Sequence, residues 1–89
     1  MPVPEDVQQE MLSRLRRIEG QARGVQRMVE EGRDCAEIIH QLASIRAATH
    51  GASVFLLKQY AQECSTVAGR EAGSDERIAE LIELMLSAS

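Results

Sequence analysis

The sequence predicts an all-α protein in which three helices form a single domain over residues 1–89. Apolar residues recur at helical spacing in three stretches, and no stretch alternates as a half-buried strand does. Only 2% of the residues are aromatic, namely one Phe and one Tyr, so little bulk is available to fill a core. Because a chain of 89 residues buries a limited share of its own surface, we expect it to oligomerise.

The first helix is predicted over about residues 6–31, and Gly32 is expected to end it. Its apolar residues alternate in steps of four and three, which is a heptad seam. The seam consists of Val7, Met11, Leu15, Ile18, Ala22, Val25 and Val29. Gly20 and Gly24 lie within this helix, where each is unfavourable by about 1 kcal/mol relative to alanine. We therefore expect them to form a notch that another backbone approaches closely.

The second helix is predicted over about residues 35–65, with Asp34 as its N-cap and Glu37 completing a capping box. It is apolar on more than one side and must be covered on more than one side. The third helix is predicted over about residues 75–87, with Ser74 as its N-cap. Its apolar face consists of Ile78, Leu81, Ile82, Met85 and Leu86.

The two cysteines lie near opposite ends of the second predicted helix. Cys35 falls in its first turn, where unpaired backbone amides and the helix dipole favour an anion such as a thiolate. Cys64 follows 29 residues later, a separation of roughly 43 Å at the rise of an α-helix, so one chain cannot join them. In an antiparallel homodimer with its two-fold axis at position 49.5, Cys35 of one chain faces Cys64 of the other. Residues 47–53 at that crossing are small apart from His50, which permits close approach.

Positive charge is concentrated in one part of an otherwise acidic chain. The net charge is −4, yet residues 13–29 contain five arginines and one glutamate, a local net charge of +4. Phosphate binding depends on the field of one face and not on the sum over the chain. We therefore predict binding to double-stranded DNA through phosphates and DNA shape. The candidate DNA-binding residues form two neighbouring stripes on the first predicted helix, with Arg46 and Lys58 on the second helix extending the surface. One stripe consists of Arg14, Arg17 and Gln21, and the other of Arg16, Arg23 and Arg27.

Three segments resemble the copper-sensitive operon repressor (CsoR) family: residues 14–21 (RLRRIEGQ), 30–35 (EEGRDC) and 41–46 (QLASIR). The resemblance extends over roughly residues 5–88. It implies an all-helical repressor that assembles as a dimer of dimers, that is, a homotetramer. It also implies that operator DNA is released when an inducer engages a cysteine-centred site between subunits, and it assigns Arg14 to operator binding.

The resemblance also bears on the inducer. Copper sensors of the family bind Cu(I) through a cysteine, a histidine 25 positions later and a second cysteine four further on. Cys35 and Cys64 fit the outer positions, but Tyr60 occupies the middle one, and a phenol is a poor ligand for a soft metal. Glu80 matches an acidic residue that supports the histidine in copper sensors, and neither His40 nor His50 falls on the ligand position.

A pair of cysteines without the middle ligand resembles the family's persulfide sensors, the sulfurtransferase-operon repressor (CstR-like) type. We therefore expect Cys35 to attack sulfane sulfur from a persulfide donor. Cys64 of the partner chain then resolves it into a di-, tri- or tetrasulfide bridge. Tyr60 is expected to shape this pocket, and no metal or other cofactor is expected.

Four other interpretations remain open at this stage. One is a Cu(I) sensor that uses Cys35 and Cys64, and another is a formaldehyde sensor that uses Pro2 and Cys35. A thiol-dependent sulfur-carrier enzyme is disfavoured, because the sequence has no Cys-x-x-Cys motif and no obvious catalytic base, so we expect no enzyme activity. A plain helical scaffold is the fourth. No apolar run reaches about 18 residues and no leader is visible, so we expect a cytoplasmic protein with no membrane partner.

Overall fold

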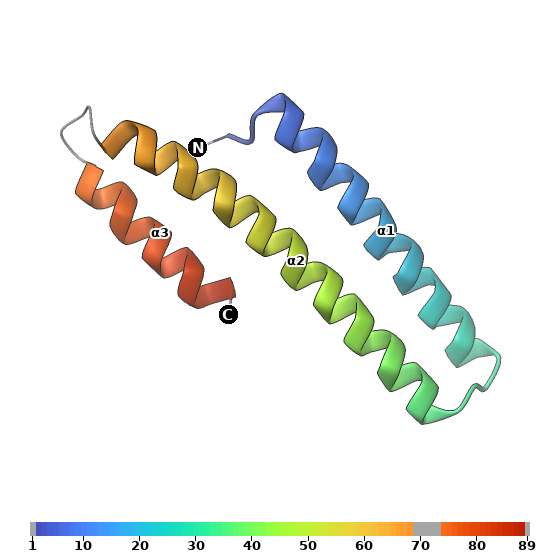
Figure 1. Cartoon of the computed structure of the whole chain (residues 1–89). Helices are drawn as coiled ribbons and strands as arrows, with labels where there is room; N and C mark the ends of the chain where they lie inside the picture. The colour runs from blue at the N-terminus through green and yellow to red at the C-terminus, as the bar shows by residue number, and fades with distance from the viewer. Residues whose placement is uncertain (1, 69–73, 89) are drawn as a thin grey trace. The chain divides into compact units, whose positions relative to one another are not determined.

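The computed structural model describes residues 2–68 and 74–88, with side chains as far as Gln62 in the second helix and from Glu76 in the third. It contains the helices α1 (Glu5–Glu30), α2 (Cys35–Ala68) and α3 (Ser74–Ala88), and no strand among the residues that it describes (Figure 1). The all-α prediction is confirmed. The chain divides into two compact units, Met1–Ala52 and Ser53–Ser89, so the two halves of α2 belong to different units.

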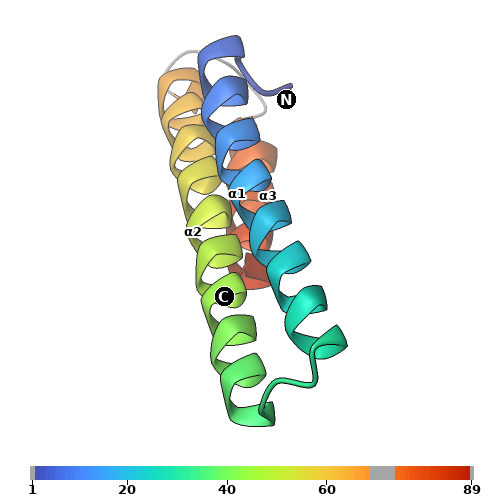
Figure 2. The ribbon, with the colours of Figure 1, turned by 90° about the vertical axis from the view of Figure 1, so that its right-hand side faces the viewer.

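The first unit is a helical hairpin. Helix α1 and the first half of α2 run antiparallel beside each other (Figures 1 and 2). Between them, Gly32 adopts a φ of 70°, in the left-handed region that favours glycine. The N–H of Gly32 donates to Val29 O at 3.1 Å, and the N–H of Arg33 donates to Met28 O at 2.9 Å. These two bonds form a Schellman motif, which ends α1 where the sequence predicts.

The start of α2 confirms one predicted cap and corrects another. The Asp34 carboxylate accepts a hydrogen bond from the N–H of Ala36 at 3.2 Å, so Asp34 is the N-cap. The prediction of a capping box is wrong, because among the described residues Glu37 accepts no hydrogen bond from the Asp34 N–H. Glu37 accepts from the Arg33 side chain at 2.9 Å, and this local ion pair takes the place of a bond back to the Asp34 N–H. The N-cap prediction for Ser74 concerns a side chain outside the described residues.

The face that α1 turns toward α2 differs in part from the predicted seam. Its least exposed side chains recur in steps of four and three: Val7 is buried, and Met11, Arg14, Ile18, Gln21, Val25 and Met28 are half-buried. Leu15 and Val29, which were predicted to lie in the seam, are 48% and 59% exposed. Compared with the predicted seam, the face of α1 that lies against α2 is shifted to a neighbouring stripe of residues, which recurs with the same period. Two polar side chains, Arg14 and Gln21, therefore occupy seam positions.

The second unit consists of α3 and the second half of α2. These two helices run antiparallel to each other (Figure 1). Of the predicted apolar face of α3, Leu81 is half-buried. The remaining members, Ile78, Ile82, Met85 and Leu86, are exposed. Helix α3 therefore presents an apolar stripe that this chain covers only in part.

The described residues contain a small core. Only Val7 and Ala52 are buried among them, and no large side chain is fully buried. In the hairpin, Leu12, Leu15, Val29, Ile39 and Leu42 are exposed. No described helix is long and apolar enough to cross a bilayer.

The notch expected at Gly20 and Gly24 is not filled within the described chain. A Cβ built on either glycine meets nothing within 4 Å. Within the described residues no other atom comes close to either glycine, so the approach of a backbone from another chain stays a prediction.

Two glycine substitutions should change stability in opposite directions. Gly20→Ala should raise the free energy of unfolding by about 1 kcal/mol, because it improves helix propensity without a clash. Gly32→Ala should lower it by about 1–2 kcal/mol, because alanine is strained at a φ of 70°. Thermal unfolding followed by circular dichroism measures both. A lower melting temperature for Gly20→Ala would mean that another molecule occupies the notch.

Candidate functional site

The predicted DNA-binding arginines of α1 fall into two groups. Arg16, Arg17 and Arg27 are exposed and form no ion pair with any residue that the structure describes. Arg14 and Arg23 each pair with a glutamate one turn earlier: the Arg14 Nε lies 3.1 Å from Glu10 Oε1, and an Arg23 Nη contacts Glu19 Oε1. A glutamate that precedes its cation by four residues has the more favourable orientation on a helix.

Arg14 and Gln21 lie on the side of α1 that faces α2. The Arg14 side chain is 38% exposed, and its Nη1 lies 3.9 Å from the position of a Cβ built on Gly51. The Gln21 amide donates from Nε2 to Ser44 Oγ at 3.3 Å. Its Oε1 is buried and accepts no hydrogen bond from any described residue. Of the candidate DNA-binding residues Arg14, Arg17 and Gln21, Arg17 is therefore exposed, whereas Arg14 and Gln21 face the second helix.

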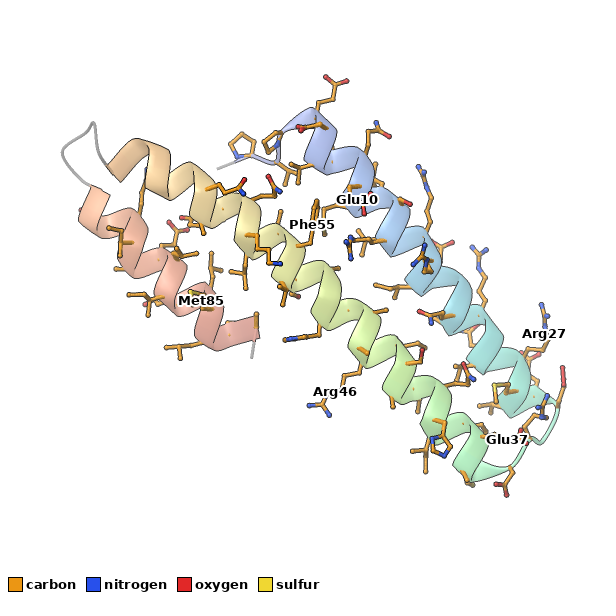
Figure 3. The ribbon with its side chains drawn as sticks, viewed as in Figure 1. Glu10, Arg27, Glu37, Arg46, Phe55 and Met85 are labelled. Atoms are coloured by element: carbon orange, nitrogen blue, oxygen red, sulfur yellow. The ribbon has the colours of Figure 1, made fainter. Side chains whose placement is uncertain are left out.

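Arg46 does not extend the surface of α1 within one chain. In Figure 3, Arg46 points away from α1, whereas Arg27 points away from α2. The two arginines thus project from opposite sides of the hairpin. Arg46 and Arg27 of one chain therefore do not form one continuous surface.

Cys35 is the first residue of α2, and its thiol is exposed and free. The start of this helix presents unpaired backbone N–H groups and the positive end of the helix dipole. The Asp34 carboxylate accepts a hydrogen bond from one of these groups, the N–H of Ala36. Cys64 lies in the same helix, and its side chain is outside the described residues. Helix α2 is continuous between positions 35 and 64, so the two cysteine positions of one chain lie 29 residues apart along one helix.

Tyr60 and Glu80 both belong to the second unit. Tyr60 lies on α2 one turn before Cys64 and is half-buried, and Glu80 lies on α3 and is exposed. Within the described ranges, no three His, Cys, Asp or Glu side chains are placed to hold a metal ion together. The structure of one chain therefore brings Tyr60 into the same helix as both cysteines but does not assemble the predicted sensor site.

The sequence analysis did not identify the residues that contact Arg14 and Gln21. Glu10 could have been found, because it precedes Arg14 by one helical turn. Ser44 and Gly51 could not, because their approach to α1 depends on how the hairpin is rotated.

The folded chain resembles proteins of one functional class, transcriptional repressors. A family model described as "metal-sensitive transcriptional repressor" matches residues 7–87. The chain belongs to this family.

Individual relatives cover most of the chain. It is 36% identical over 75 residues to the copper-sensing transcriptional repressor CsoR of Bacillus subtilis, covering 84% of this chain and 74% of that protein. The Cu(I)-bound structure of the copper-sensing repressor CsoR from Geobacillus thermodenitrificans superposes with a TM-score of 0.87 at 36% identity, covering 98% and 91% of the two chains.

Solved structures of regulators with other inducers are also similar. The nickel-responsive regulator InrS gives a TM-score of 0.82 at 37% identity, covering 91% of each chain. A variant of the formaldehyde-responsive regulator FrmR from Salmonella enterica gives 0.82 at 27% identity, covering 99% and 100%. One fold therefore serves sensors of chemically different inducers, so the inducer must be argued from the residues of each chain.

Gln21 offers a test of what the helical seam requires. Gln21→Leu should raise the free energy of unfolding by about 1 kcal/mol, because it removes a buried acceptor without a partner. The melting temperature should rise by about 4–8 °C for a domain of this size. Gln26→Leu, the same substitution at an exposed position of α1, is the control and should leave stability nearly unchanged. Loss of DNA affinity without a gain in stability would instead assign the Gln21 amide to the DNA interface.

Proposed function

We propose that the chain is a DNA-binding repressor that senses reactive sulfur species through Cys35 of one subunit and Cys64 of its partner. The observation that carries the proposal is the placement of both cysteines on one unbroken helix, with Cys35 exposed and free at its first turn. Tyr60 at the middle position of the family's copper motif favours sulfur chemistry over a soft metal. Operator DNA is the partner, and the cytoplasm is the expected compartment.

An antiparallel pairing of two α2 helices supplies what one chain lacks. With the two-fold axis at position 49.5, Cys35 faces Cys64 of the partner subunit. Ile39 then faces Tyr60 of the partner subunit, and Leu42 faces Leu57 of the partner subunit. Ile39 and Leu42 are exposed in the single chain, so this pairing gives them apolar cover. Two such dimers form the proposed homotetramer, in which several copies of α1 and of Arg46 can face one duplex.

The proposed chemistry needs only the two thiols and a persulfide donor. The Cys35 thiolate attacks the outer sulfur of an organic persulfide, giving a Cys35 persulfide and releasing the donor as a thiol. The Cys64 thiolate of the partner subunit then attacks the inner sulfur of Cys35 and expels hydrosulfide, which leaves a disulfide. If both cysteines carry a persulfide, the terminal sulfur of one attacks the inner sulfur of the other chain's persulfide, and the product is a trisulfide with loss of hydrosulfide.

Release of DNA follows from the position of the bridge. Helix α2 carries both cysteines, and its first half packs along the basic helix α1 at Ser44 and Gly51. A covalent bridge between subunits changes which packing of α2 is favoured. If that packing places the copies of α1 at a spacing that no longer fits the duplex, the operator is released.

Cu(I) sensing is the second candidate, and it is favoured by the similarity to copper-sensing repressors of 36% identity. Cys35 and Cys64 would supply two thiolates across the dimer. The formaldehyde alternative meets a geometric obstacle in one chain, because Pro2 precedes the start of α1 and Cys35 follows its end (Figure 1). These residues lie at opposite ends of the hairpin, so that reaction also requires a second subunit.

Arg14 is expected to contribute to operator binding. Arg14→Ala should weaken operator affinity and lower the slope of log affinity against log salt by about one for each Arg14 that contacts a phosphate. The fold should persist, because the side chain is partly exposed and not part of the buried core. Arg77→Ala on α3 removes the same charge and serves as the control. A gel shift over a salt series measures both, and unchanged affinity at matched salt would contradict the role of Arg14.

The inducer is tested by intact-mass analysis paired with an operator-release assay. A persulfide donor should join two wild-type chains, with or without an added sulfur, and release the DNA. Cys64→Ser should keep added sulfur on Cys35 without joining chains, and Cys35→Ser should do neither. Cu(I), peroxide and formaldehyde are run in parallel. Tight Cu(I) binding with release, and no release by persulfide, would support the copper alternative instead.

A further inference from the structure

Helix α1 carries two glutamates that pair with arginines proposed to bind DNA phosphates. Glu10 and Glu19 each hold an arginine that the proposed function assigns to phosphate. The two pairs differ in their surroundings. The Arg23 and Glu19 side chains are 72% and 60% exposed, so water and salt screen that pair strongly.

The Glu10–Arg14 pair is less exposed, at 50% and 38% for the two side chains. The Glu10 carboxylate accepts from the Arg14 Nε at 3.1 Å. On its other side, the Arg14 guanidinium approaches the backbone of α2, with Nη1 3.9 Å from a Cβ built on Gly51. A larger residue than glycine would narrow this space. Arg14 therefore rests between a carboxylate and a neighbouring helix, and it has fewer accessible rotamers than an arginine on an open helix face.

We propose that Glu10 is a specificity-determining residue for DNA binding, because its carboxylate competes with phosphate for Arg14. This inference rests on the proposed function. A duplex that places a phosphate against the Arg14 guanidinium must break the Glu10–Arg14 pair, and its phosphate then also lies near the negative charge of Glu10. A duplex that places phosphates elsewhere leaves the pair intact. The pair therefore weakens binding to a duplex that engages Arg14 more than binding to a duplex that does not.

In the proposed tetramer, this competition limits the affinity for DNA. Four copies of a segment with five arginines would bind any duplex through counterion release. A repressor must also leave its operator when the inducer arrives, and excess affinity for the operator opposes that release. Glu10 reduces this affinity while it leaves the exposed Arg16, Arg17 and Arg27 to attract DNA.

The test compares Glu10→Gln with Glu30→Gln in the full-length protein. Both remove one negative charge from α1, but Glu30 forms no ion pair with a described residue. Affinity for the operator and for an unrelated duplex of equal length is measured by fluorescence anisotropy over a salt series. Glu10→Gln should tighten binding to the operator by about two-fold for each copy in which a phosphate contacts Arg14, the size of an exposed pair one turn apart. It should tighten binding to the unrelated duplex less, so that the ratio of the two affinities widens, and it should steepen the salt dependence.

The double variant Arg14→Ala/Glu10→Gln separates competition from net charge. Without Arg14, the effect of Glu10→Gln should fall to that of Glu30→Gln. Equal effects of the two glutamate variants in the presence of Arg14 would overturn the inference. Weaker binding by Glu10→Gln would also overturn it and would make Glu10 a residue that positions Arg14 for phosphate. If the wild-type protein binds operator and unrelated DNA equally, the proposed repressor function fails, which is a different outcome.

Discussion

The structure depends on apolar surface that a single chain leaves uncovered. Among the described residues only Val7 and Ala52 are buried, while Leu15, Val29 and Ile39 remain exposed. Burial of apolar surface is the main favourable term in folding, and it must offset the entropy lost when the chain is ordered. A second copy that covers Ile39 through the proposed pairing of α2 would add to the buried apolar surface. The proposed antiparallel pairing of α2 therefore serves folding as well as sensing.

The same helix connects the two proposed activities. Helix α2 carries Cys35 and Cys64, and its first half holds α1 through Gln21–Ser44 and the approach of Arg14 to Gly51. Polar side chains at seam positions stabilise a hairpin less than apolar ones would, and the buried Gln21 Oε1 adds to that cost. A hairpin without a dense core can change its packing at a modest cost in free energy. That property suits a repressor whose DNA-bound and released forms must be close in free energy.

The acidic average of the chain and its proposed affinity for DNA are compatible. The net charge is −4, but the exposed Arg16, Arg17 and Arg27 carry positive charge that no described carboxylate pairs. Glu10 and Glu19 reduce the field of the remaining arginines by direct contact. The number of arginines in the segment therefore exceeds the positive charge that is free to attract DNA. Pairing with glutamates sets the size of that charge.

Local features of the fold could be read from the sequence by itself. The Gly32 terminus, the Asp34 cap and the position of both cysteines on one helix depend on hydrogen bonds between residues a few positions apart. The family resemblance likewise depended on contiguous segments. The register of α1 against α2 could not be predicted, because apolar periodicity selects the stripe with Leu15 and Val29, whereas the stripe that faces α2 includes Arg14 and Gln21. Only the packing of the hairpin placed Arg14 and Gln21 against α2 and left Leu15 and Val29 exposed.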